Sequence, residues 1–327
     1  MGMLIDGVWT TKWYEPDEAG KFVRPETRFR DQVTADGSSG YPAVAGRYHL
    51  YVSHACPWAH RTLLARGLLG LEQAITVAVV EPFMGEDGWT FGAREGCTPD
   101  PIFGADFLRS IYLRADPHYS GRVTVPVLWD RERATIVCNE SRELLRMLDV
   151  EFAALHTIPI TLYPKSMRAQ VDRTLDQIYA PINNGVYRAG FATEQTAYEE
   201  AVRELFAALD HWDGVLAKQR FLCGEVVTEA DIAMFTTLLR FDPVYVGHFK
   251  CNVRRISDYP RLSNYLRDLY QLPGVAALCR IDHIQEHYYR SHPNINPTGI
   301  VPLGPELDLR APHDRSRHGG ELFATAQ

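Results

Sequence analysis

The sequence contains no apolar run that approaches the ~20 residues a membrane-spanning helix needs. It has no long run of Lys or Arg either, and its 34 basic residues are outnumbered by 41 acidic ones, for a net charge of −7. These absences argue against a membrane protein and against a nucleic-acid-binding protein. The first residues, Met-Gly-Met-Leu-Ile-Asp, also lack the pattern of a signal peptide, so we expect a cytoplasmic protein.

The six cysteines form no Cys-x-x-Cys pair and have no histidine partners at the spacing of a zinc site. The sequence therefore predicts neither a thioredoxin-type dithiol nor a bound metal. Scattered cysteines of this kind are typical of a reducing compartment. Five of them are interpreted as ordinary reduced thiols: Cys97, Cys138, Cys223, Cys251 and Cys279.

Cys56 stands where a predicted strand turns into a predicted helix. Residues 47–52 are rich in aromatic and β-branched side chains, and residues 56–70 carry apolar residues at helical spacing. Pro57 suits the first helical position, where its missing N–H costs nothing. Because a helix N-terminus favours an anion, we expect a lowered pKa for Cys56 and a reactive thiolate at neutral pH. Position 59 is Ala, so a second molecule of a small thiol must release any mixed disulfide, which points to glutathione.

Two other interpretations of Cys56 stay open on the residues alone. The first is a buried structural cysteine, which is common for this residue type. The second is activation by an ion pair with a flanking histidine, His54 or His60. His60 lies one helical turn beyond Cys56, and we expect it to point away.

The first half of the chain predicts a thioredoxin-like α/β domain. Its patterning indicates a parallel βαβ unit, a long loop, a β-hairpin and a helix, which is the order of the thioredoxin fold. Pro126 falls inside a predicted strand, where proline needs an edge or a special site, and a cis Val125–Pro126 bond would turn the Val125 backbone toward a ligand. The predicted elements are strands at 47–52 and 75–80 around the helix at 56–70, strands at 123–129 and 135–137, and a helix at 139–148.

The second half predicts an all-helical domain. From Pro164 to His292 the apolar spacing is helical, and Thr228-Glu-Ala-Asp231 has the pattern of an N-terminal capping box. Helices are predicted at 165–180, 194–217, 228–241, 258–271 and 274–290. The chain divides into an irregular N-terminal extension (1–46), the thioredoxin-like domain (47–150), a linker (151–163), the helical domain (164–313) and a tail (314–327) that we expect to be loose.

Several stretches in one order give the chain a resemblance to a known family. They span about residues 46–313 and include Ala55-Cys-Pro-Trp-Ala-His-Arg-Thr62, Gly121-Arg-Val-Thr-Val-Pro-Val-Leu-Trp-Asp130 and Arg240-Phe-Asp-Pro-Val-Tyr245. The set resembles the Xi-class glutathione transferases, or glutathionyl-hydroquinone reductases. This implies the glutathione transferase fold, a thioredoxin-like N-terminal domain plus an all-α C-terminal domain. One departure is Cys138 where the family usually has Asn before Asn-Glu-Ser, which we expect to be a packing change.

The resemblance also implies a glutathione site on the first domain. Glu140 and Ser141 would hold the γ-glutamyl ammonium and carboxylate, and a helix N-terminus favours the carboxylate. Val125 would hydrogen-bond the cysteinyl backbone, and Arg122 would reach the glycine carboxylate, since Arg suits paired oxygens. Trp89 would lie over the glutathione. Without the resemblance, a helix cap, a solvated strand end and a core aromatic remain as explanations of these residues.

Three tyrosines are implied to face the Cys56 thiol across the domain cleft. Tyr187 resembles the proton donor to the leaving hydroquinone, and Tyr245 and Tyr288 resemble the pair that steadies the thiolate. A phenol with a pKa near 10 stays protonated at pH 7 and can donate. The chain has 16 tyrosines, so on the residues alone these three would be read as ordinary aromatics.

The implied reaction is the glutathione-dependent reduction of an aromatic glutathionyl-hydroquinone. Cys56 attacks the thioether sulfur, hydroquinone leaves, and a second glutathione resolves the mixed disulfide to give oxidised glutathione. No metal, flavin or nicotinamide is required, and the family forms homodimers. Two alternatives stay open: an omega-like thioltransferase or dehydroascorbate reductase that uses the same Cys56, and a non-catalytic binding module with the same fold.

Overall fold

A four-stranded mixed sheet of order β4-β3-β6-β7 forms the centre of the first half of the chain in the computed structural model, which describes residues 2–326. The central strand β3 (Tyr48–Val52) is buried along its whole length. It pairs in parallel with β4 (Thr76–Val79) and antiparallel with β6 (Val127–Asp130), which pairs with β7 (Thr135–Cys138). The predicted thioredoxin order is therefore confirmed. Pro126 immediately precedes β6 instead of lying inside a strand, which explains how it avoids breaking the ladder.

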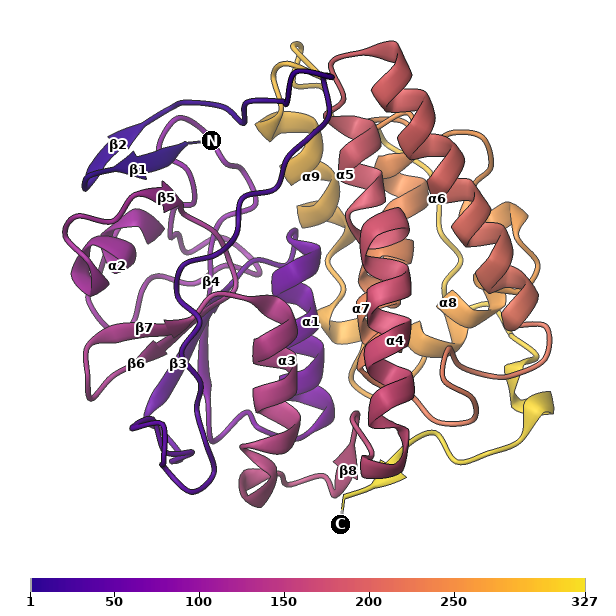
Figure 1. Cartoon of the computed structure of the whole chain (residues 1–327), viewed down its shortest axis with the longest axis horizontal. Helices are drawn as coiled ribbons and strands as arrows, with labels where there is room; N and C mark the ends of the chain where they lie inside the picture. Colours follow the sequence, from indigo (N-terminus) through magenta and orange to yellow (C-terminus); the bar gives the residue numbers. More distant parts are fainter. Residues whose placement is uncertain (1, 327) are drawn as a thin grey trace.

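Two helices of this domain stand between the sheet and the second domain (Figure 1). They are α1 (Pro57–Leu68), which connects β3 to β4, and α3 (Ser141–Val150). Helix α1 packs against both α3 and the long buried helix α7 of the second domain. A third helix, α2 (Leu108–Ala115), contacts β7. The start of α1, which carries Cys56, is thus held at the contact between the domains.

The second domain is helical, as predicted. Helix α7 is buried at every residue, and its expected capping box is present, since Asp231 accepts from both the amide and the hydroxyl of Thr228 at 2.8 Å. A short helix, α5, and two π-helical turns were not predicted. No helix within residues 2–326 is long and apolar enough to cross a bilayer. The helices are α4 (Arg168–Ile178), α5 (Gly185–Gly190), α6 (Gln195–Val215), α7 (Glu229–Arg240), α8 (Leu262–Tyr270) and α9 (Ile281–Ser291), with π turns at Tyr179–Asn183 and Phe241–Tyr245.

The N-terminal extension is more ordered than predicted. A hairpin of β1 (Met3–Ile5) and β2 (Val8–Thr10) adds to β5 (Gly121–Arg122) as a small three-stranded sheet. The turn is Asp6-Gly7, both at positive φ, which is a strong two-residue hairpin signal. The rest of the extension then runs across the front of both domains (Figure 1). It is fastened to α6 by the Lys21–Glu200 ion pair and to β7 by the bond from the Asp31 amide to the Val137 carbonyl.

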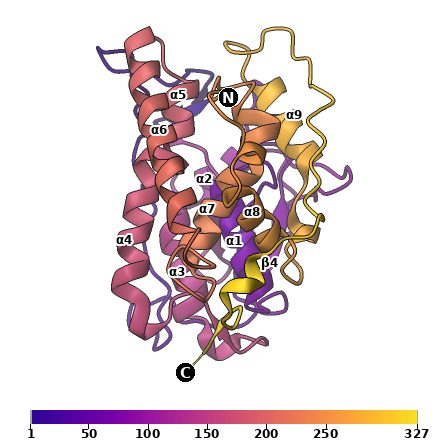
Figure 2. The ribbon, with the colours of Figure 1, turned by 90° about the vertical axis from the view of Figure 1, so that its right-hand side faces the viewer.

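The prediction of a loose tail is wrong. The tail follows the outer face of the helical domain (Figure 2), and β9 (Ala324–Thr325) pairs with β8 (Ile160–Thr161) of the linker. Arg315 is fully buried, and its guanidinium donates to the carbonyls of Leu216, Gln219 and Arg220. A buried cation with several carbonyl partners anchors the chain where its Pro and Gly content suggests only an extended coil.

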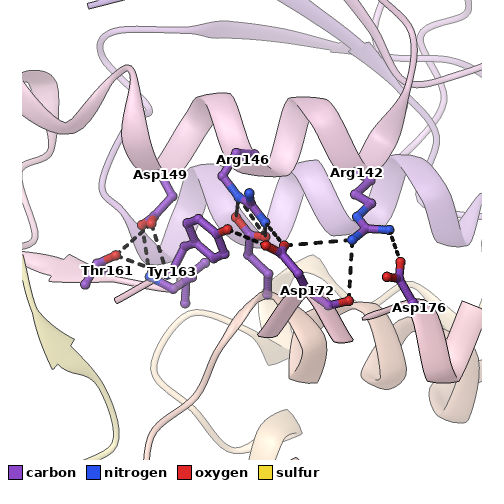
Figure 3. Close-up of polar contacts among 9 residues, drawn as sticks. Arg142, Arg146, Asp149, Thr161, Tyr163, Asp172 and Asp176 are labelled. Atoms are coloured by element: carbon purple, nitrogen blue, oxygen red, sulfur yellow. Dashed lines mark hydrogen bonds and ion pairs between the residues drawn. The ribbon is translucent and has the colours of Figure 1, made fainter. Parts of the chain in front are cut away.

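A polar network joins the two domains between α3 and α4 (Figure 3). Arg146 of α3 donates to the carboxylates of Asp172 on α4, at 2.8 Å, and Glu229 at the start of α7, at 2.9 Å. Glu229 is fully buried, and burial raises its pKa to about 7 although Arg146 opposes that shift. Nearby, Arg142 pairs with Asp176, and Asp149 accepts from the backbone of Leu162 and Tyr163 and from the Thr161 hydroxyl.

Removing the cation from this network is expected to destabilise the protein. Arg146→Met leaves the Glu229 carboxylate buried without its partner, and breaking such a pair costs about 3 kcal/mol or more. We expect a lower midpoint in urea unfolding. The double variant Arg146→Met/Glu229→Leu removes both charges and should recover most of the loss. Equal stability of wild type and Arg146→Met would show that the pair contributes nothing.

Candidate active site

Cys56 occupies the position that its sequence context predicts. It is the N-cap of α1, with extended backbone angles, and Pro57 is the first helical residue. The side chain is half-buried, and its thiol donates to the Val125 carbonyl at 3.6 Å. The Val125–Pro126 bond is cis. Since Cys56 also lines a cavity, a purely structural role for its thiol does not fit.

The expected lowering of the Cys56 pKa is wrong for the ligand-free protein. Burial raises the pKa of this thiol. The amides of Ala59 and Trp58 at the start of α1 and the charges of Arg240 and Arg24 oppose that rise but do not cancel it. The helix start therefore acts in the predicted direction, and desolvation of the thiolate outweighs it.

A cavity of about 480 Å³ brings together four of the five residues predicted to bind glutathione. Arg122, Val125, Glu140 and Ser141 all line it. Glu140 is the N-cap of α3 and accepts from the Arg142 amide at 3.2 Å, and Ser141 begins the helix. The cavity thus combines a helix N-terminus, an arginine and a carboxylate, which suits a zwitterion with additional carboxylate groups.

The fifth residue, Trp89, lines a smaller neighbouring cavity of about 70 Å³. This cavity also receives Cys56, Tyr187 and Tyr288. Trp89 is buried and stacks on His287, with ring centroids 4.8 Å apart and an interplanar angle of 14°. The space beside the thiol is therefore walled by aromatic rings, which suits a flat aromatic group.

The three predicted tyrosines meet at their hydroxyl groups. The Tyr288 oxygen lies 2.5 Å from that of Tyr187 and 3.0 Å from that of Tyr245. Burial raises the pKa of Tyr187 to about 12, with the Cys56 charge as the second cause, and raises the pKa of the other two phenols further. All three are protonated at neutral pH. Tyr245 is fully buried and absent from the cavity lining, so it reaches the cavity through Tyr288.

Neither flanking histidine is placed to form an ion pair with Cys56. His60 directs Nδ1 toward Arg240, at 3.3 Å, and Nε2 toward Cys279, at 3.9 Å. His54 directs Nδ1 toward the Leu278 carbonyl, and burial lowers its pKa to about 4. Burial also lowers the pKa of His60 well below the usual value. Both rings are neutral at pH 7, and the histidine-activation alternative is wrong.

The N-terminal extension contributes residues that the sequence did not reveal. Tyr14 and Arg24 line both cavities, and Phe22 lines the smaller one. The Arg24 guanidinium lies 4.8 Å from the ring centroid of Tyr187 and 4.9 Å from that of Trp58. The extension has no periodicity that would mark an element. Its only signal was a group of aromatic residues in an otherwise polar stretch, which we interpreted only as anchors.

Comparison with known proteins gives consistent matches in both domains. Residues 55–151 match the family model for the glutathione S-transferase N-terminal domain, and residues 195–268 match that for the C-terminal domain. The glutathionyl-hydroquinone reductase YqjG of Escherichia coli is 53% identical, covering 96% of this chain and 98% of that protein. PcpF of Sphingobium chlorophenolicum, also a glutathionyl-hydroquinone reductase, is 49% identical over 94% of this chain and 98% of its own length.

Solved structures agree with this pattern. An Xi-class glutathione transferase from Natrialba magadii superposes with a TM-score of 0.93 at 55% identity, covering 98% of each chain. The glutathione-bound structure of YqjG superposes with a TM-score of 0.89 at 51% identity, covering 96% of this chain and 99% of that one. The similarity thus extends over both domains and nearly the whole chain.

Proposed function

Because the chain belongs to the glutathione transferases, and within them to the Xi-class glutathionyl-hydroquinone reductases, we propose that it reduces glutathionyl-hydroquinones with glutathione through Cys56. The observation that carries this proposal is the position of the Cys56 thiol. It lies at the start of α1, bonded to Val125 of the larger cavity and lining the aromatic cavity that also holds Tyr187. One sulfur atom therefore has access to a peptide-like ligand on one side and to an aromatic ring on the other.

The glutathionyl part of the substrate occupies the larger cavity. Glu140 accepts from the γ-glutamyl ammonium, and the Ser141 hydroxyl and amide at the start of α3 bind the adjoining carboxylate. Arg122 binds the glycine carboxylate; it is already held against the extension, since it donates to the Lys12 carbonyl at 2.6 Å. The backbone of Val125 pairs with the cysteinyl residue, which replaces the Cys56 thiol on the Val125 carbonyl and leaves that thiol free to ionise.

The chemical step is a displacement at the thioether sulfur. The Cys56 thiolate forms a bond to that sulfur while the bond from sulfur to the ring carbon breaks, and the carbon keeps the electron pair. Tyr187 gives its proton to the ring carbon, so hydroquinone leaves as a neutral product. Cys56 then carries glutathione as a mixed disulfide, and Tyr288, itself bonded to Tyr245, is the nearest group to reprotonate Tyr187.

A second glutathione completes the cycle. Its thiolate attacks the glutathione sulfur of the mixed disulfide, the Cys56 thiolate leaves, and oxidised glutathione is released. Position 59 is Ala, so the active-site turn offers no internal thiol for this step. Two electrons pass from two glutathione sulfurs to the ring carbon, and no further redox group takes part.

The test is turnover of glutathionyl-menadiol with excess glutathione, followed by chromatography. We expect menadiol and oxidised glutathione to appear in equal amounts. Substrate that is consumed without oxidised glutathione, or no turnover at all, would overturn the proposal.

Two finer statements rest on the family pattern. We propose a homodimer, for which light scattering during gel filtration should give twice the 37.1 kDa chain mass. We also propose a cytoplasmic location, because six free cysteines and a reactive thiol suit a reducing compartment.

A further inference from the structure

Arg240 connects the helical domain to the loop that carries Cys56. It is the last residue of α7 and is fully buried. Its guanidinium donates to the carbonyl of His54 at 2.7 Å and to that of Ala55 at 2.9 Å. These are the two peptide groups immediately before Cys56. A third bond, at 2.7 Å, goes to the Thr236 carbonyl of its own helix.

The charge of Arg240 has no anionic partner. Within residues 2–326 its polar contacts are the three carbonyls and the ring of His60, and none is a carboxylate. His60 and His54 are neutral, because burial lowers the pKa of both rings. The other fully buried arginine, Arg315, is likewise held by carbonyls, but it lies at the tail, far from the site. A buried cation without a counter-ion is costly, so an anion that forms beside it is stabilised.

We propose that Arg240 is a positioning residue for the reaction, which fixes the peptide groups before Cys56 and supplies, from the second domain, the buried positive charge against which the thiolate forms. This inference rests on the proposed role of Cys56 as the nucleophile. It assigns a function to the contact between the domains, since the thiol belongs to the first domain and the charge to the second.

The surroundings of the thiol support this assignment. Arg240 lowers the pKa of Cys56 and is the largest charge effect on it, ahead of Arg24. The other groups that face or line the site are Arg24 from the extension, Arg61 from α1, Tyr187 from α5, and His287, Tyr288 and His292 from and after α9. Arg24 lies against aromatic rings, and Arg61 is influenced most by the Glu140 charge. The phenols and imidazoles are neutral at pH 7, which leaves Arg240 as the cation without an anion of its own.

The experiment is the pH dependence of Cys56 alkylation by iodoacetamide, read by mass spectrometry of the Cys56 peptide. Arg240→Gln removes the charge and keeps an amide donor, whereas Arg240→Lys keeps the charge. We expect the Gln variant to raise the apparent pKa of Cys56 by about one unit or more, so that alkylation at pH 7 slows about tenfold. The Lys variant should show less than half of that shift. Arg240→Met serves as a second neutral replacement, and urea unfolding establishes which variants are folded.

Arg66→Met is the matched control. Arg66 also donates to two carbonyls, those of Ile75 and Glu72, but it lies in the last turn of α1. Its loss should leave the alkylation profile of Cys56 unchanged. A wild-type profile in a folded neutral variant, or equal shifts in the Gln and Lys variants, would overturn the role of the charge. Alkylation needs no substrate, so this result is independent of whether glutathionyl-hydroquinones are turned over.

Discussion

Replacing Cys56 by Ser is expected to abolish the turnover of glutathionyl-menadiol, with a loss of about 10³-fold or more. A serine hydroxyl is not ionised at neutral pH and forms no mixed disulfide, so the first bond of the reaction cannot be made. The measurement is menadiol release at saturating glutathione. Glutathione binding itself should persist in calorimetry, because the residues of the larger cavity are unchanged.

Cys97→Ser is the matched control for this substitution. Cys97 is also a free cysteine, and it donates to the Val80 carbonyl at 3.6 Å, a bond that a serine hydroxyl can replace. It lines neither cavity at the site. Turnover in the Cys97→Ser variant should match wild type. Residual activity of Cys56→Ser within tenfold of wild type would mean that another group attacks the sulfur.

Tyr187→Phe is expected to slow glutathionyl-menadiol reduction by about 10²- to 10⁴-fold, the usual value of a positioned acid. The same variant should reduce a small glutathione mixed disulfide at nearly the wild-type rate. The physical reason is the leaving group, because a ring carbon must be protonated as it departs, whereas a thiolate leaves without a proton. Both rates are measured in steady state at the same pH.

This pair of rates also separates the reductase from the omega-like alternative. Equal losses on both substrates would favour a thioltransferase, in which Tyr187 only shapes the site. Tyr198→Phe is a suitable control, since the Tyr198 hydroxyl also makes one hydrogen bond, at 2.7 Å to the Lys250 carbonyl, but lies outside both cavities. It should leave both rates unchanged.

Local patterns made much of the site predictable. The strand-to-helix change around Cys56 and Pro57 depends on residues adjacent in sequence, and so does the helix that begins at Ser141. The capping box at Thr228 is of the same kind. The roles of the tyrosines are different, because three distant segments must fold before their hydroxyls meet. Only the family resemblance singled them out among 16 tyrosines.

The features that the sequence did not reveal are contacts between distant, irregular segments. Arg24 lies in a stretch without periodicity, and its place over Tyr187 and Trp58 depends on where the extension crosses the domains. Arg315 anchors the tail through carbonyls that no side-chain pattern marks. The raised pKa of Cys56 is of the same kind. The helix start is local and visible in the sequence, whereas burial depends on the entire packing around the thiol.

The most direct measurement of the central claim is the intact mass of the protein after it is mixed with one equivalent of glutathionyl-menadiol and no free glutathione. We expect one glutathionyl group on Cys56, located by peptide mapping, together with one equivalent of free menadiol. Addition of glutathione should then restore the unmodified mass and release oxidised glutathione. Menadiol release from a protein that stays unmodified, or an adduct on any other cysteine, would contradict the account.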